Sequence, residues 1–283
     1  MALERPDLSG RTAFITGTTR GIGKRIALAL ADAGCNVVST GKTVDDTDSD
    51  LDGTIHKTAA ECEQRGVETH AIRLNLRDPT QIEAAVEEAI DVFDEIDIVI
   101  NNASAIQQAT IEEMPANRFD LMTEVNVRGT YLTSRAFVPH LRDIGGGHVL
   151  TNSPPIAIDR APGGAAYMWS KLGMTFVTLS LAGEVADDGI AANTFWPVTA
   201  IDTRATRYFG MGTEDEWRSP EVVSDTVLEL LKRDPNEFTG NAVYDEDVLR
   251  EAGVSDFSKY NLTDGDPSPS SARMADPDYE RPE

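Results

Sequence analysis

Two kinds of apolar segment alternate along this 283-residue chain. Short runs rich in β-branched residues, such as Arg11–Thr16 and Asn36–Thr40, are followed by stretches with helical periodicity, such as Gly21–Ala33. Strands that alternate with helices pair in parallel, because each helix returns the chain to the same edge of the sheet. The sequence therefore predicts an α/β fold with a single doubly wound parallel sheet, flanked by helices on both faces.

The alternation extends over most of the chain. Further strands are expected at Glu68–Leu74, Ile96–Ile100, Gly147–Thr151, Ile190–Phe195 and Ala242–Tyr244, and helices at Ile55–Arg65, Pro79–Phe93, Pro115–Leu141, Ala165–Ala186 and Pro220–Lys232. We expect one domain over residues 1–262, with a mobile lid near 199–219. Residues 263–283 are rich in Pro, Ser and Asp, so we expect a flexible acidic tail there.

Acidic side chains dominate the composition. The 48 Asp and Glu residues outnumber the 25 Lys and Arg residues and give a net charge of −23, which repels nucleic acids and anionic membranes. The first residues lack the apolar core of a secretion signal, and no apolar run reaches the roughly 18 residues needed to cross a bilayer. We expect a cytoplasmic protein with no nucleic-acid or membrane partner.

The excess of carboxylates is typical of proteins from salt-accumulating halophiles, in which high salt screens the self-repulsion. The alternative is an ordinary acidic cytosolic protein. The two cysteines, Cys35 and Cys62, have the spacing of neither a disulfide scaffold nor a metal site, so no metal is expected.

A glycine-rich turn, Thr16–Gly23, joins the first expected strand to the first expected helix. Glycines let the backbone approach a pyrophosphate, and the helix N-terminus offers N–H groups to it. An ordinary tight turn is the alternative, but the strand–turn–helix context favours a dinucleotide. After the second strand, Gly41 stands where a carboxylate would bind an NAD ribose. Lys42 and Arg20 can pair with a 2′-phosphate, which favours NADP(H) over NAD(H), unless Lys42 is only a solvated surface charge.

Tyr167 and Lys171 are four residues apart in an expected helix and therefore share one face. A nearby ammonium lowers the pKa of a phenol from about 10, so the phenol can exchange a proton with a carbonyl or alcohol oxygen. Ser153 follows the fifth strand, where its hydroxyl can polarise that oxygen. Asn126 is a polar amide in an apolar run. It can hold a water in a relay to Lys171, or it can be a satisfied core residue.

In order and spacing, these motifs resemble those of the short-chain dehydrogenase/reductase family. The matching positions are Thr16–Gly23, Asn101–Ala103, Asn126, Ser153, Tyr167 and Lys171, within about Leu8–Tyr244. The resemblance implies a Rossmann-like fold, a homodimer or homotetramer, and NADP(H)-dependent interconversion of a carbonyl and an alcohol on a small or lipid-like molecule. It implies that Tyr167 is the acid/base, Ser153 orients the substrate, Lys171 binds ribose and tunes Tyr167, and Asn126 supports the relay.

The resemblance and the strand-end positions together predict a nucleotide site. Its expected residues are Gly17, Thr19, Arg20, Gly21, Ile22, Gly23, Lys42, Asn75, Leu76, Asn102, Ala103, Ser104, Tyr167, Lys171, Pro197, Thr199 and Ile201. Closer details resemble one subgroup that often carries a C-terminal sterol-carrier domain. This sequence stops too soon for that domain, so we expect no lipid-carrier role. Pro154 and Pro155 stiffen the segment beside Ser153, which departs from the usual substrate geometry.

Two other functions share this scaffold. The chain would bind NADP(H) without turnover if it were a sensor or scaffold protein, although an intact set of Ser153, Tyr167 and Lys171 argues against that. A dehydratase or epimerase is the third alternative.

Overall fold

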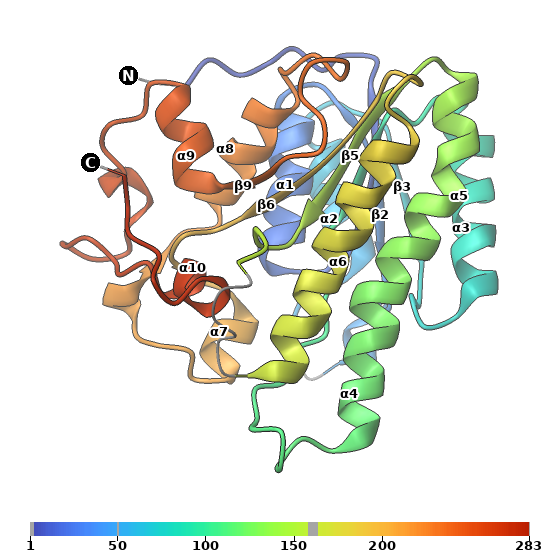
Figure 1. Ribbon diagram of the computed structural model, residues 1–283. Helices are drawn as coiled ribbons and strands as arrows, with labels where there is room; N and C mark the ends of the chain where they lie inside the picture. Colours follow the sequence, from blue (N-terminus) through green and yellow to red (C-terminus); the bar gives the residue numbers. More distant parts are fainter. Residues whose placement is uncertain (1–2, 50, 158–163, 283) are drawn as a thin grey trace.

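The computed structural model describes residues 3–49, 51–157 and 164–282. Seven strands form one parallel sheet in the order β3-β2-β1-β4-β5-β6-β9, with helices on both of its faces (Figure 1). The order reverses direction between β1 and β4, which is the switch point of a doubly wound sheet. The predicted fold class is confirmed.

Most elements lie within a few residues of their predicted ranges. The sheet contains β1 (Thr12–Thr16), β2 (Asn36–Gly41), β3 (Thr69–Arg73), β4 (Ile98–Asn101), β5 (Gly147–Asn152), β6 (Ile190–Trp196) and β9 (Ala242–Tyr244), while β7 (Ala200–Ile201) pairs with β8 (Trp217–Arg218). The helices are α1 (Gly21–Asp32), α2 (Ile55–Glu63), α3 (Pro79–Phe93), α4 (Ala116–Met122), α5 (Gly129–Asp143), α6 (Ala165–Glu184), α7 (Arg204–Tyr208), α8 (Glu221–Leu230), α9 (Asp245–Glu251) and α10 (Ser270–Ala275). The expected helix Pro115–Leu141 is α4 and α5 joined by a π-helical turn, η2 (Thr123–Arg128).

Side chains of the interior strand β1 alternate between two cores. Ala13 and Ile15 pack under α1 and α8, whereas Phe14 packs under α3 and α5. The rings of Phe14 and Phe137 lie 4.9 Å apart, edge to face. Burial of each such side chain stabilises the fold by about 1.5–3 kcal/mol, so the two cores lock the sheet between its helical layers.

The C-terminal segment differs from the flexible tail expected for it. The small residues Ala272 and Ala275 of α10 are fully buried, and Trp196 Nε1 donates a hydrogen bond to Ser271 O at 3.0 Å. Arg281 forms an ion pair with the buried Glu246 at 3.0 Å. These contacts hold α10 at the carboxyl edge of the sheet, where α7 also lies (Figure 1). A polar composition does not prevent packing where a few small and aromatic side chains find a complementary surface.

None of the helices in the described part of the chain has the length and apolar character needed to span a membrane. The same residues contain no group of His, Cys, Asp or Glu side chains arranged to hold a metal ion.

Candidate active site

One cavity of about 1000 Å³ opens at the carboxyl ends of the strands. Ligand sites in doubly wound sheets lie at this edge. The cavity is lined by every residue predicted to bind the nucleotide except Thr199. Topology thus brings together residues that the sequence spreads from Gly17 to Ile201.

The glycine-rich turn forms one wall of the cavity. A Cβ on Gly23 would lie 2.2 Å from Gly17 O and 2.4 Å from Asn102 Nδ2. Asn102 Nδ2 donates hydrogen bonds to Thr16 O at 3.0 Å and Gly17 O at 3.2 Å, which ties the turn to the segment after β4. Only a residue without a side chain fits at position 23. The bare backbone and the N-terminus of α1 therefore face the cavity, as a bound pyrophosphate requires.

Three cationic residues line the end of the cavity beyond β2. Lys42 is exposed there. Arg20 donates hydrogen bonds to Leu51 O at 3.2 Å and Gly53 O at 3.3 Å, and burial followed by the charge of Arg204 lowers its pKa. Arg204, at the start of α7, forms an ion pair with Asp52. We did not predict Arg204 from the sequence. The signal that could have found it is a cationic side chain within the expected lid of a strongly acidic protein.

Tyr167 lines the cavity near the N-terminus of α6, with only 8% of its surface exposed. Its hydroxyl is hydrogen-bonded to the side chain of Ser104, which is exposed and also lines the cavity. Burial raises the pKa of Tyr167 above its ordinary value of 10, and the hydrogen bond to Ser104 lowers it by a smaller amount. We expected Lys171 to lower this pKa. In this structure, desolvation of the phenolate has the larger effect, and the pKa of Tyr167 rises.

Lys171 is buried, and its ammonium donates a hydrogen bond to Asn152 O. Nζ lies 5.1 Å from the centroid of the Trp196 ring, whose face attracts a cation. Burial lowers the pKa of Lys171 to about 7. At neutral pH its charge is therefore sensitive to anything that binds beside it, and Lys171 does line the cavity.

Asn126 is fully buried in the π-helical turn η2, a kind of turn that is often found at functional sites. Its Oδ1 accepts a hydrogen bond from Ala105 N at 2.7 Å. Its Nδ2 donates to Ala105 O at 2.9 Å and to Ser170 Oγ at 2.8 Å. Asn126 thus joins the segment after β4 to α6. Both of its amide hydrogens are engaged, so its side chain has none left to donate to the relay water that we expected it to hold.

Ser153 and Thr199 are not among the residues that line the cavity, contrary to the predicted contacts. Both are fully buried. Ser153 Oγ lies 2.9 Å from Thr175 Oγ1 of α6, and its backbone N–H donates to Phe195 O at 3.0 Å. The hydroxyl therefore points into the packing between β5 and α6. Thr199 follows Val198, whose carbonyl is held by α10 backbone N–H groups.

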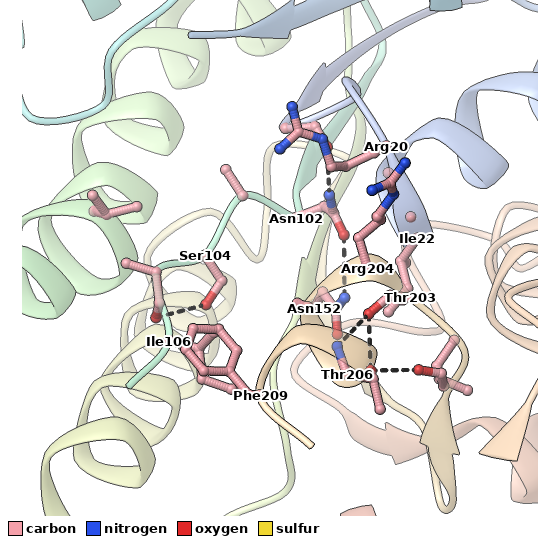
Figure 2. Close-up of a pocket in the computed structure, with 18 of the residues that line it drawn as sticks. Arg20, Ile22, Asn102, Ser104, Ile106, Asn152, Thr203, Arg204, Thr206 and Phe209 are labelled. Atoms are coloured by element: carbon pink, nitrogen blue, oxygen red, sulfur yellow. Dashed lines mark hydrogen bonds between the residues drawn. The ribbon is translucent and has the colours of Figure 1, made fainter. Parts of the chain in front are cut away.

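The end of the cavity away from Arg20 and Arg204 is largely apolar. Figure 2 places Ser104, Ile106 and Phe209 at this end and the two arginines at the other. Further apolar lining comes from Leu121, Val125, Met211 and Met274. We did not predict Met274, because it lies in the C-terminal segment that we expected to be flexible.

Comparison with known proteins identifies the family. A model of the short chain dehydrogenase family matches residues 11–211. The chain belongs to this family. The family is one of NAD(P)-dependent oxidoreductases, and the resemblance inferred from the motifs is confirmed.

The curated relatives include the rat hydroxysteroid dehydrogenase-like protein 2, which is 42% identical over 263 residues. The match covers 92% of this chain and 50% of the rat protein, so the chain spans about half the length of that relative. A solved short chain dehydrogenase from Mycobacterium thermoresistibile has a TM-score of 0.86 and 41% identity, covering 92% of this chain and 94% of its own. A solved protein from Xanthomonas campestris has a TM-score of 0.85 and 37% identity, covering 99% of this chain and 100% of its own.

Proposed function

We propose that this enzyme interconverts a carbonyl and an alcohol on a small or lipid-like substrate, with NADP(H) favoured over NAD(H). One observation supports this most strongly: Tyr167 and Lys171 line the same cavity as the glycine-rich turn, whose geometry excludes a side chain at Gly23. The nicotinamide nucleotide, held by that turn and by Lys171, supplies the hydride chemistry when bound.

Tyr167 is the proposed acid/base. During reduction its hydroxyl gives a proton to the carbonyl oxygen, and during oxidation the phenolate takes a proton from the alcohol. Lys171 is the proposed partner of the ribose hydroxyls and stabilises the phenolate that forms; its position on the cavity wall, one helical turn from Tyr167, supports this role. Asn126 is a positioning residue, because its hydrogen bonds fix Ala105 against α6.

The cationic end of the cavity supports NADP(H). Gly41, and not a carboxylate, ends β2, while Arg20, Lys42 and Arg204 line the space beyond it. Arg20 already donates hydrogen bonds to two loop carbonyls, whereas Lys42 forms no ion pair within the described part of the chain, so Lys42 is the cleaner position to test. Loss of a charge-assisted contact of about 1.4 kcal/mol raises a dissociation constant tenfold. Lys42→Ala should therefore raise KM for NADPH about tenfold and leave KM for NADH unchanged.

The apolar end of the cavity supports a substrate with an apolar body. Phe209 and Met211 come from the segment 199–219, which we infer to be a lid over the substrate. The ion pair between Arg204 and Asp52 would tie the closed lid to the segment after β2.

We propose a homodimer or homotetramer in the cytoplasm. The outer faces of α5 and α6 support the assembly, and the cysteines support the compartment. Tyr131, Trp169 and Phe176 are 52%, 48% and 67% exposed on these helices. Aromatic side chains of this size are typical of subunit contacts. Both cysteines are free and buried, as suits a reducing compartment. The molar mass in solution, measured by light scattering for the wild type and Phe176→Arg, tests the assembly.

A panel of ketones, aldehydes and alcohols tests the reaction, with NADPH and NADH run side by side in low and molar KCl. Turnover followed at 340 nm is expected with some carbonyl, faster with NADPH. Tyr167→Phe should abolish turnover while nucleotide binding, measured by fluorescence titration, stays within about twofold. Binding without any change at 340 nm would favour a sensor. Product formation without net nucleotide oxidation would favour a dehydratase or epimerase.

A further inference from the structure

The hydroxyl groups around Tyr167 do not have the arrangement expected from the sequence. Ser104 is exposed, lines the cavity and is hydrogen-bonded to the Tyr167 hydroxyl. Ser153 is fully buried and does not line the cavity. A substrate oxygen placed to exchange a proton with Tyr167 would thus have the Ser104 hydroxyl beside it.

The Ser153 side chain is directed away from the cavity. Thr175 Oγ1 lies 2.6 Å from Pro154 O and 2.9 Å from Ser153 Oγ. A hydroxyl has one hydrogen, so Thr175 cannot donate to both. Whichever oxygen Thr175 bonds, its contact with Ser153 Oγ holds that hydroxyl group against α6 and away from the cavity. Ser153 is therefore a structural link between β5 and α6.

Ser104 is held in place by Asn126. Two hydrogen bonds, of 2.7 and 2.9 Å, pin both backbone groups of the next residue, Ala105, to the Asn126 side chain. The same amide donates to Ser170 Oγ at 2.8 Å, and Ser170 Oγ donates to Tyr167 O at 2.7 Å. One buried amide therefore fixes the segment that carries Ser104 relative to the turn of α6 that carries Tyr167. Such preorganisation is what a catalytic hydroxyl pair requires.

The Ser104 hydroxyl is also free enough to turn toward a ligand. Its other hydrogen bond, to Ala105 O, is long at 3.3 Å. Replacing this hydrogen bond by one to a substrate oxygen costs little free energy, because a hydrogen bond of that length is weak.

We propose that Ser104 is a catalytic residue that, together with Tyr167, binds the carbonyl or alcohol oxygen of the substrate in place of Ser153. The role rests on the proposed function. As electron density moves onto the carbonyl oxygen, the Ser104 O–H donates a hydrogen bond to it and keeps its own proton. The proton that the oxygen gains comes from Tyr167, which becomes the phenolate. In the oxidative direction the same bonds form and break in reverse.

The test compares Ser104→Ala, Ser104→Thr and Ser153→Ala in the full chain, with the best carbonyl substrate and saturating NADPH. Loss of one donor to a developing oxyanion lowers kcat by about 10²-fold, so that is the loss expected for Ser104→Ala. NADPH affinity should stay within about twofold, since the lost contact is to the substrate. Ser104→Thr keeps a hydroxyl and should retain most of kcat. Ser153→Ala should lose less than about threefold.

The pH dependence of kcat/KM adds a measurement that a packing defect would leave unchanged. Because the Ser104 hydrogen bond stabilises the Tyr167 phenolate, its removal should shift the basic limb of the kcat/KM profile to higher pH. Ser224→Ala, on the remote helix α8, serves as the control for folding, and thermal unfolding is recorded for each variant.

Several results would overturn the role of Ser104. Full activity in Ser104→Ala refutes it, as does a greater loss in Ser153→Ala than in Ser104→Ala. Equal losses in Ser104→Ala and Ser104→Thr, with no shift of the pH profile, assign Ser104 to packing alone. A wild-type protein that turns over no carbonyl refutes the proposed function, and this role with it.

Discussion

Asp245, the first residue of α9, carries an unusual carboxyl group, and its replacement by asparagine gives a quantitative test of the structure. Its Oδ1 accepts hydrogen bonds from Val198 N at 2.8 Å and Glu246 N at 2.7 Å, while its buried Oδ2 has no hydrogen-bond partner among the residues that the structure describes. Burial raises the pKa of Asp245 from 3.8 to about 7. The contact with Val198 makes this group a support of the segment 197–201 on the nucleotide side of the cavity.

The sign of the pH effect follows from the two pKa values of Asp245. Between about pH 4 and pH 7 the unfolded chain releases a proton that the folded protein keeps, so stability falls as pH rises through this window and then levels off. The difference between about 7 and 3.8 corresponds to about 4 kcal/mol, at 1.36 kcal/mol per pH unit. Asp245→Asn keeps the acceptor for both N–H groups and removes the charge. It should therefore stabilise the protein most above pH 7.

The assay is thermal unfolding by circular dichroism at pH 5 and pH 8, at one salt concentration. The gain in Tm for Asp245→Asn should be about 5 °C larger at pH 8 than at pH 5, since a kcal/mol shifts Tm by about 2 °C in a chain of this size. The exposed Asp187→Asn is the control for removing one negative charge. An equal gain at both pH values, or a loss at pH 8, would refute this account of Asp245.

Three further predictions concern the turn, the π-helical segment and the surface. Gly23→Ala should weaken NADPH binding more than about 100-fold in a fluorescence titration, because its Cβ would meet Gly17 O at 2.2 Å; unchanged affinity would mean that the turn does not hold the nucleotide. Asn126→Ala removes three buried hydrogen bonds and should cost about 3 kcal/mol of unfolding free energy in urea, together with most of kcat; a variant of normal kcat would show that the link between Ala105 and α6 is dispensable. If the net charge of −23 reflects a halophilic source, Tm should rise steeply between low salt and molar KCl, and equal stability in both would contradict that origin.

The fold and the nucleotide side of the site were predictable because they depend on local pattern. The alternation of strands and helices specifies the sheet. The glycines of Thr16–Gly23 leave the backbone of the turn bare, which predicts a pyrophosphate site. Tyr167 and Lys171 could be paired from helical spacing alone. Each of these predictions needed only the geometry of a single strand, turn or helix.

The substrate side was less predictable because it depends on contacts between distant segments. The sequence places a serine after β5, but the direction of its hydroxyl depends on Thr175, 22 residues later on α6. The sequence predicted Ser153 as the catalytic serine and Ser104 as a nucleotide contact, and only packing shows that Ser104 and not Ser153 lines the cavity. Met274 and Arg204 enter the cavity through α10 and α7, elements whose placement depends on tertiary contacts.

Transfer of deuterium from the nucleotide to the substrate tests the central claim most directly. The enzyme is incubated with NADPH that carries deuterium on C4 and a ketone that it reduces, and the alcohol is analysed by NMR. We predict deuterium on the carbon that bears the new hydroxyl, formed by the wild type and not by Tyr167→Phe. An alcohol without deuterium on that carbon, or labelled alcohol formed equally well by Tyr167→Phe, would contradict the proposed mechanism.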